Sequence, residues 1–269
     1  MNVNVRPPAV AGMFYPGHAG ELDHMLGECF AQAHPHPGKR PKALIAPHAG
    51  YIYSGPVAAS AYALLQPLRD IIRCVILLGP VHRVWVPGLA LPEADAFDTP
   101  LGRVPLDQES IARIRQLPQV SVSDAAHAQE HSLEVQLPFL QRMLAAFSLV
   151  PLAVGGASTE EVAEVLDLLW GGDETLIVLS SDLSHYLPYQ AAERTDQATA
   201  KAILEMDPHL HGEQACGARP LNGLLLAAKR RGLSIELLDL RNSGDTAGNR
   251  GQVVGYGAFA LAEASHAPS

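Results

Sequence analysis

Short, continuously apolar runs that alternate with amphipathic stretches form the dominant pattern along the chain. Such runs are typical of strands in a sheet that helices cover on both faces, whereas strict apolar–polar alternation would indicate a strand with one solvated face. The stretches between the runs carry apolar residues at helical spacing. The pattern therefore predicts an α/β fold with a central sheet. The expected strands are residues 42–46, 74–78, 148–154, 175–179, 234–240 and 253–261.

Several of the expected helices have recognisable ends. Ser54 can cap a helix that carries Pro56 in its first turn, and Ser158 with Glu161 has the form of a capping box. Pro138 should kink the helix expected over residues 131–146 or open a new one. The expected helical segments are 22–31, 54–68, 108–117, 131–146, 158–170, 190–206 and 221–231, and residues 84–104 are expected to be irregular or a hairpin.

Length and composition narrow the class of protein. The 269 residues show no internal repeat and no interdomain linker, so one domain over residues 1–269 is expected, with a disordered tail after about residue 263. The net charge of −9 and the absence of a Lys/Arg run argue against a nucleic-acid or anionic-membrane surface. No apolar stretch reaches the about 18 residues that a membrane-spanning helix needs. No membrane or nucleic-acid partner is therefore expected.

The cysteines indicate the compartment. Cys29, Cys74 and Cys216 are odd in number and far apart, so a disulfide framework is not expected. The N-terminus also lacks the basic start and apolar core of a signal peptide. We therefore expect a cytoplasmic protein.

A histidine follows three of the expected strands. The carboxyl ends of strands in an open α/β sheet face the ligand crevice, so loops from different strands can converge there. Imidazole binds iron, zinc and copper and also transfers protons near neutral pH. The three histidines together predict a functional site, although each one alone could merely hydrogen-bond a strand-end turn. They are His48 after strand 42–46, His82 after strand 74–78, and His185, which follows Asp182, after strand 175–179.

Two further groups are candidates for the same site. Cys216 lies at the expected start of a helix, whose N-terminal amides would lower the thiol pKa and favour the thiolate, and Gly217 permits close approach of a ligand. Glu130 beside His131 could orient this histidine, or both could belong to a solvated helix start. Cys29 and Cys74 are expected in the core.

Several longer segments resemble the Memo family, which is named for a mediator of ErbB2-driven cell motility and has many bacterial and archaeal members. The resemblance implies a single-domain mixed sheet with helices on both faces, shared with the class III extradiol (LigB-like) ring-cleaving dioxygenases. The matching segments are residues 6–16 (RPPAVAGMFYP), 46–55 (APHAGYIYSG), 78–82 (LGPVH), 130–138 (EHSLEVQLP), 180–185 (SSDLSH) and Cys216-Gly217.

The resemblance also implies a metal site. Its ligands would be His48, His82 and Cys216, with Fe(II) as the expected metal and Cu or Zn as alternatives. The dioxygenases have a carboxylate in the third position, and a thiolate there would favour Cu(I) or Zn(II) more strongly. This departure puts ring cleavage in doubt.

Roles for other residues follow from the same resemblance. His185 matches an acid/base group beside the metal, and Asp182 could orient His185 or approach the metal. His131 would handle protons or bind substrate. Tyr51 and Phe14 would line the pocket and contact substrate, with core packing as the alternative.

These residues are compatible with more than one function. The first is a non-haem Fe(II) oxidoreductase acting on a small chelating or aromatic substrate. The second is a non-catalytic adaptor or metal-handling protein that keeps the pocket and binds a small molecule or a peptide. A weaker third is a hydrolase with a Cys216 nucleophile. The resemblance further implies radical-SAM and AMMECR-type proteins as partners in a modification pathway, known as the AmmeMemoRadiSam association.

Overall fold

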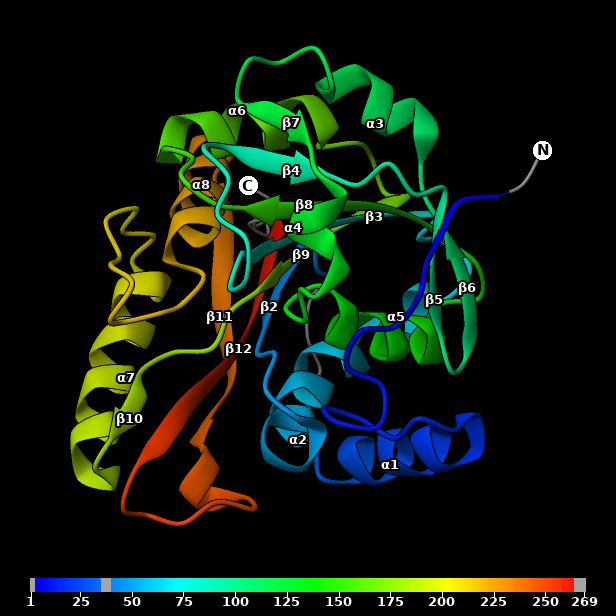
Figure 1. The fold of residues 1–269 in the computed structure, drawn as a ribbon. Helices are drawn as coiled ribbons and strands as arrows, with labels where there is room; N and C mark the ends of the chain where they lie inside the picture. The colour runs from blue at the N-terminus through cyan, green and yellow to red at the C-terminus, as the bar shows by residue number, and fades with distance from the viewer. Residues whose placement is uncertain (1–2, 35–39, 264–269) are drawn as a thin grey trace, which may run out of the picture.

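The computed structural model describes residues 3–34 and 40–263, and a mixed β-sheet forms its centre (Figure 1). The tail expected to be disordered lies outside the described residues. The strands of this sheet are β2 (Ala43–Ala46), β3 (Cys74–Pro80), β4 (Leu89–Leu91), β7 (Val120–Val122), β8 (Ser148–Val154), β9 (Thr175–Ser180), β10 (His185–Leu187), β11 (Leu233–Asn242) and β12 (Val253–Glu263). Within the described ranges their order is β10-β12-β2-β9-β3-β8-β4-β7, with β11 paired to β12.

The middle of the sheet is parallel. Strands β2, β9, β3 and β8 pair in parallel, and every residue of β2, β3 and β9 is buried. Strands β12 and β4 add antiparallel neighbours on the two sides. The continuously apolar runs therefore lie where both faces of the sheet are covered, and the carboxyl ends of β2, β9 and β3 lie at one edge.

Helices cover both faces of the sheet, which confirms the expected α/β class (Figure 1). Helix α2 packs on β2, β11 and β12 with α1 beside it, and α8 packs on β3 and β9 with α6 beside it. The helices are α1 (Ala19–Ala31), α2 (Tyr51–Tyr62), α3 (Gln108–Ile114), α4 (Asp124–Ala128), α5 (Leu137–Met143), α6 (Thr159–Leu169), α7 (Tyr189–Leu204) and α8 (Ala218–Arg230), with short 3-10 turns η1 (Ala63–Leu68), η2 (Glu134–Gln136) and η3 (Ser243–Asp245).

A second, smaller sheet contains the segment expected to be a hairpin. Strands β5 (Ala96–Thr99) and β6 (Gly102–Pro105) form that hairpin, and β1 (Val5–Arg6) joins β5 in parallel.

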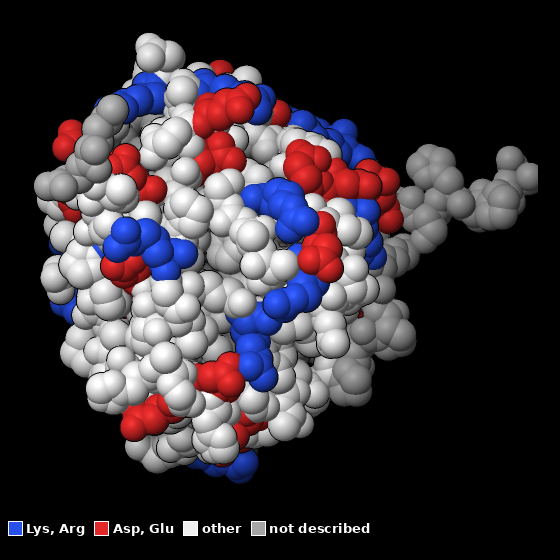
Figure 2. Space-filling view, turned by 90° about the vertical axis from the view of Figure 1, so that its right-hand side faces the viewer, with Lys and Arg blue, Asp and Glu red and all other residues white. Residues whose placement is uncertain are grey.

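On the face of the molecule in Figure 2, basic and acidic side chains are interspersed among uncharged ones. Neither sign dominates that face.

The start expected for the helix at Ser54 is wrong for an identifiable reason. Helix α2 begins at Tyr51, whose backbone N–H donates to the Phe14 carbonyl, so Pro56 lies inside the helix. Ser54, the expected cap, instead donates its hydroxyl to the Ala49 carbonyl from within the first turn. The capping box of Ser158 at the start of α6 is confirmed.

The segment 131–146 is not one continuous helix, and a new helix opens at Pro138, as the sequence predicts. The segment forms a turn, then η2, then the seven-residue α5, which has Pro138 in its first turn. The turn forms because the Glu130 carboxylate accepts the backbone N–H groups of His131 and Ser132, at 2.9 Å each.

A buried carboxylate anchors the N-terminal segment to this region. Glu134, whose side chain is fully buried, accepts hydrogen bonds from Arg6 Nη1 at 2.7 Å and from the Tyr15 hydroxyl at 2.6 Å. It also accepts the backbone N–H groups of Ala9 and Val10. One side chain thus holds residues 6–15 in place, and Phe14 within them contacts the site described next.

Candidate metal centre

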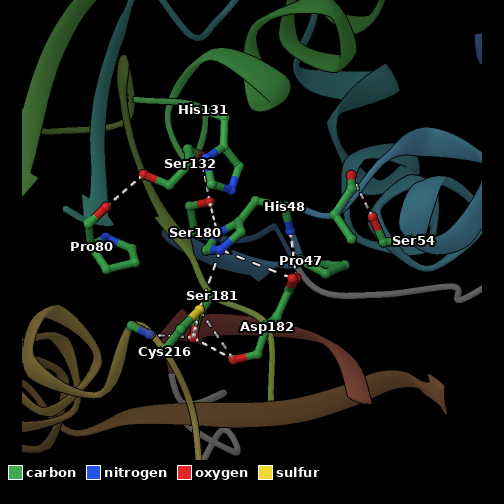
Figure 3. Close-up of polar contacts among 12 residues, drawn as sticks. Pro47, His48, Ser54, Pro80, His131, Ser132, Ser180, Ser181, Asp182 and Cys216 are labelled. Atoms are coloured by element: carbon green, nitrogen blue, oxygen red, sulfur yellow. Dashed lines mark hydrogen bonds and ion pairs between the residues drawn. The ribbon is translucent and has the colours of Figure 1, made fainter. Parts of the chain in front are cut away.

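Loops from adjacent parallel strands converge at one edge of the sheet. His48 follows the end of β2 by two residues, His82 follows β3 by two, and Asp182 follows β9 by two. His131 reaches the same point from the turn between α4 and η2. Ring nitrogens of His48, His82 and His131 all lie within 4.8 Å of one another, and Figure 3 shows His48 and His131 of this cluster. The convergence expected from strand-end positions is therefore present for His48 and His82.

The His48 ring is held in one tautomer. Its Nδ1 lies 2.9 Å from the Ser180 hydroxyl, which donates its only proton to the Ser132 carbonyl at 2.6 Å. Gln136 donates to the same hydroxyl oxygen. Ser180 can therefore only accept from His48, so Nδ1 carries the hydrogen and Nε2 keeps its lone pair. Burial lowers the pKa of His48 well below its usual value, which keeps the ring neutral.

Glu130 orients His82 in the same way. Its carboxylate accepts the His82 Nδ1–H at 2.8 Å and the His82 backbone N–H at 2.5 Å. Burial alone would raise the pKa of Glu130, but hydrogen bonds from His82 and Ser132 lower it to about 2. A charged carboxylate on Nδ1 leaves His82 Nε2 free to bind a metal and makes it a better donor.

His131 completes a cluster of three imidazoles. Its ring stacks on His82 at a centroid distance of 4.6 Å, and Phe14 lies 4.7 Å from it. Burial lowers the pKa of His131 to about 4, so this ring is also neutral at pH 7. We expected His131 to handle protons, and its place in the cluster makes it a candidate ligand as well.

Cys216 lies against the first of these histidines. Its Sγ is 3.2 Å from His48 Nε2 (Figure 3), and its backbone N–H donates to the Asp182 carbonyl. The next N–H, of Gly217, donates to the Ser181 hydroxyl at 2.9 Å. A Cβ at Gly217 would lie 2.7 Å from Ser181 Cβ, so glycine permits this close approach.

The expected effect of helix α8 on the thiol is wrong. Burial, together with the nearby Asp182 carboxyl, raises the pKa of Cys216 to about 12. Hydrogen bonds from the Ser181 hydroxyl and from the backbone of Gly217, the N-cap of α8, lower the pKa but do not offset desolvation. The metal-free thiol is therefore protonated, and coordination would have to displace this proton.

Asp182 approaches the centre from the loop after β9, whereas His185, the first residue of β10, is not part of the cluster of three histidines. Asp182 Oδ1 accepts the His48 backbone N–H at 2.7 Å, and Oδ2 lies 4.0 Å from His48 Nε2. Burial raises the pKa of Asp182 to about 7. His185 Nδ1 lies 2.8 Å from the Leu183 carbonyl, so its Nδ1 is protonated and its Nε2 is an acceptor. Asp182 thus positions His48, and its hydrogen bonds do not reach His185.

The two residues expected to line the pocket differ in their surroundings. Tyr51 is buried against Tyr15 and Phe139, and its hydroxyl donates to the Val135 carbonyl at 2.6 Å. This environment is the core packing that the sequence left open for Tyr51, whereas Phe14 contacts His131.

Sequence reasoning missed Ser180 and Gln136, although both lie in segments that carry the family resemblance.

The donor set fits a single transition-metal ion. Neutral imidazoles whose ring nitrogens lie within 4.8 Å of one another, and a thiol beside them, match the ligands that Fe(II), Zn(II) and Cu prefer. The hydrogen bonds from Ser180 and Glu130 fix two rings before any metal arrives. His48, His82 and either Cys216 or His131 would hold the ion.

Glu130→Gln is expected to weaken metal affinity by about 10- to 100-fold. The variant keeps the volume of Glu130 but loses the charge, and it cannot accept all four N–H groups that the carboxylate binds. Competition titration with a chromophoric chelator measures the affinity. Glu161→Gln, at an exposed helix cap, is the control and should leave the affinity unchanged. Equal affinities of Glu130→Gln and wild type would contradict the assigned role.

Comparison with known proteins places the chain in a family. Residues 6–260 match the family model described as Memo, a Memo-like protein. A MEMO1 family protein of Aquifex aeolicus is 35% identical over 94% of this chain and 98% of its own, and one of Methanosarcina barkeri is 37% identical over 95% and 99%.

A crystal structure of an uncharacterized Escherichia coli K12 protein shares the fold. Its TM-score is 0.51 at 15% identity, and the match covers 82% of this chain and all of the other. Within the described residues no helix is long and apolar enough to cross a membrane. The match to the family model over residues 6–260, together with these relatives, shows that the chain belongs to the Memo family.

Proposed function

We propose that this protein is a mononuclear non-haem metal protein whose pocket supports an oxidoreductase reaction on a small chelating or aromatic substrate. The observation that carries the proposal is that Ser180 and Glu130 fix the tautomers of the His48 and His82 rings. In both rings the Nε2 lone pair remains available, and the two rings lie close together at the same edge of the sheet. His48, His82 and Cys216 are the proposed ligands, with Fe(II) as the metal and Cu or Zn as alternatives.

When bound, Fe(II) would supply coordination positions for a chelating substrate and for O2. The protein's own groups supply the remaining chemistry. His185 keeps its Nε2 available because Nδ1–H is committed to the Leu183 carbonyl, so it can accept a proton from a substrate hydroxyl. Phe14, in the N-terminal segment, packs against the ring of His131.

The second candidate function is metal handling or ligand binding without turnover. It is favoured by the Cys216 thiol, because sulfur is a softer donor than the carboxylate of a dioxygenase and would hold Cu(I) or Zn(II) more tightly. In that case a small molecule or peptide would bind in the pocket. The proposed radical-SAM or AMMECR-type partners would then interact with the protein in its ligand-bound state.

Cys216→Ala is expected to lower metal content well below that of wild type when both are purified with iron and without oxygen. The variant removes the sulfur that lies 3.2 Å from His48 Nε2 and adds no steric conflict. Elemental analysis gives the occupancy, and His131→Ala tests the other candidate for the third ligand in parallel. Unchanged metal content in Cys216→Ala, with loss in His131→Ala, would transfer the third ligand to His131.

Oxygen consumption separates the two functions. Iron-loaded wild type is expected to consume O2 with at least one member of a catechol panel, and His185→Ala should slow this reaction while retaining iron. Iron-loaded protein that consumes no O2 across the panel would refute the oxidoreductase and leave the binding function.

A further inference from the structure

A cavity of about 640 Å³ lies beside the metal centre, and Cys216 forms part of its wall. Its other walls come from the end of β3, the end of β8, the start of α6 and the segment that leads into α8. Pro80, on the same side of His48 as Cys216 in Figure 3, belongs to the wall as well. The volume is within the range that small-molecule sites occupy. The cavity thus offers room for a ligand that extends from the metal centre.

Part of the cavity lining is apolar and aromatic. Trp85 lines it with 71% of its surface exposed, which is unusual for so large an apolar side chain. Val81, Val154 and Leu210 line it too. An accessible indole face beside aliphatic side chains is a surface on which a flat or apolar ligand can pack.

The cavity also contains a cation that has no acidic partner. Within residues 3–34 and 40–263, Arg219 makes no ion pair, and its Nη1 has only a 3.4 Å contact with the Ala157 carbonyl. Arg219 lies in the first turn of α8, which holds no acidic residue and has no side-chain cap at Gly217. A guanidinium binds a carboxylate through two parallel N–H bonds, and the positive end of the helix adds to the attraction.

Glu160 limits what this cation can bind. It lines the same cavity from the first turn of α6, and within the described residues it too makes no ion pair. His211, whose side chain is exposed, also lines the cavity. A phosphate dianion would meet one arginine and an opposing carboxylate, whereas a monoanionic carboxylate can bind at the Arg219 end with less repulsion.

We infer that the cavity binds the substrate, and that this substrate carries a carboxylate, bound by Arg219, on an apolar or aromatic body that packs against Trp85. The inference rests on the proposed function, because it names the substrate class of the same site. The carboxylate would lie at Arg219, and the body would occupy the part of the cavity that Trp85 and Cys216 line.

Trp85 itself provides the signal for a test. The chain has two tryptophans, and Trp170→Phe leaves Trp85 as the only one. In metal-free Trp170→Phe protein at pH 7, we titrate 3-phenylpropionate and its uncharged amide while exciting indole fluorescence. The acid is expected to cause a saturable change and to bind at least about tenfold more tightly than the amide, as a charge-assisted arginine contact implies.

Three further variants locate the charge, each built in the Trp170→Phe background. Arg219→Gln should remove the preference for the acid, and Glu160→Gln should increase it. Arg194→Gln, at an exposed position on α7, is the matched control and should change nothing. A lack of saturable change with the acid, equal binding of acid and amide, or unchanged acid binding in Arg219→Gln would overturn the inference. Because the titration needs neither metal nor turnover, its result is independent of the oxygen-consumption assay.

Discussion

His48→Ala is expected to reduce the metal content of the purified protein from about one ion per chain to background. His48 is 2% exposed, and its Nε2 points at Cys216 Sγ because the Ser180 hydroxyl holds the other side of the ring. Losing a residue that merely orients a ligand costs about 10- to 100-fold in affinity, so losing the ligand itself should cost more. Elemental analysis and a chelator titration measure the two quantities.

The control for this variant is His185→Ala. It removes a histidine from the same sheet edge, but we assign His185 to proton transfer, so the metal content should stay at the wild-type value. Circular dichroism of both variants checks that the sheet is intact. His48→Ala protein that is folded and binds metal as tightly as wild type would refute the proposed centre.

Glu134→Gln is expected to lower the free energy of unfolding by about 3–5 kcal/mol. The side chains of Arg6 and Glu134 are 6% and 0% exposed, so the variant would leave a buried guanidinium without its counter-charge. The neutral amide would also give weaker hydrogen bonds to the Ala9 and Val10 N–H groups and to Tyr15. Urea denaturation followed by circular dichroism measures the change.

The ion pair between Asp98 and Arg103 provides a matched comparison. It is solvent-exposed in the β5–β6 hairpin, so Asp98→Asn should leave the urea midpoint where it is in wild type. If Glu134→Gln also left the midpoint unchanged, the N-terminal segment would not depend on this carboxylate. If Glu134→Gln kept the wild-type stability but changed the metal affinity, the Glu134 carboxylate would instead act through the positions of Phe14 and His131.

Features set by local pattern could be predicted from the sequence. The buried strands are continuous apolar runs, since both faces of a parallel strand are covered. His48 and His82 then follow as partners because residues after adjacent parallel strands meet at one edge. The capping box at Ser158 is equally local, because it involves only Ser158 and Glu161.

Features set by contacts between distant segments could not be predicted. The start of α2 depends on the Phe14 carbonyl, and the orientation of Glu130 in the turn at His131 depends on its hydrogen bonds with His82. The short strands β1 and β10 form only because a partner strand lies beside them. The pKa of Cys216 is another case, because its burial comes from packing that no local motif encodes.

The distance along the chain between the candidate ligands has a thermodynamic consequence. His48 and Cys216 are 168 residues apart in sequence and 3.2 Å apart in space, so the unfolded chain holds no comparable binding site. An ion that binds the native state alone shifts the folding equilibrium by mass action. The melting temperature should therefore rise with free metal concentration, and chelation should lower it. In a cell, the supply of metal would then help to set how much folded protein accumulates.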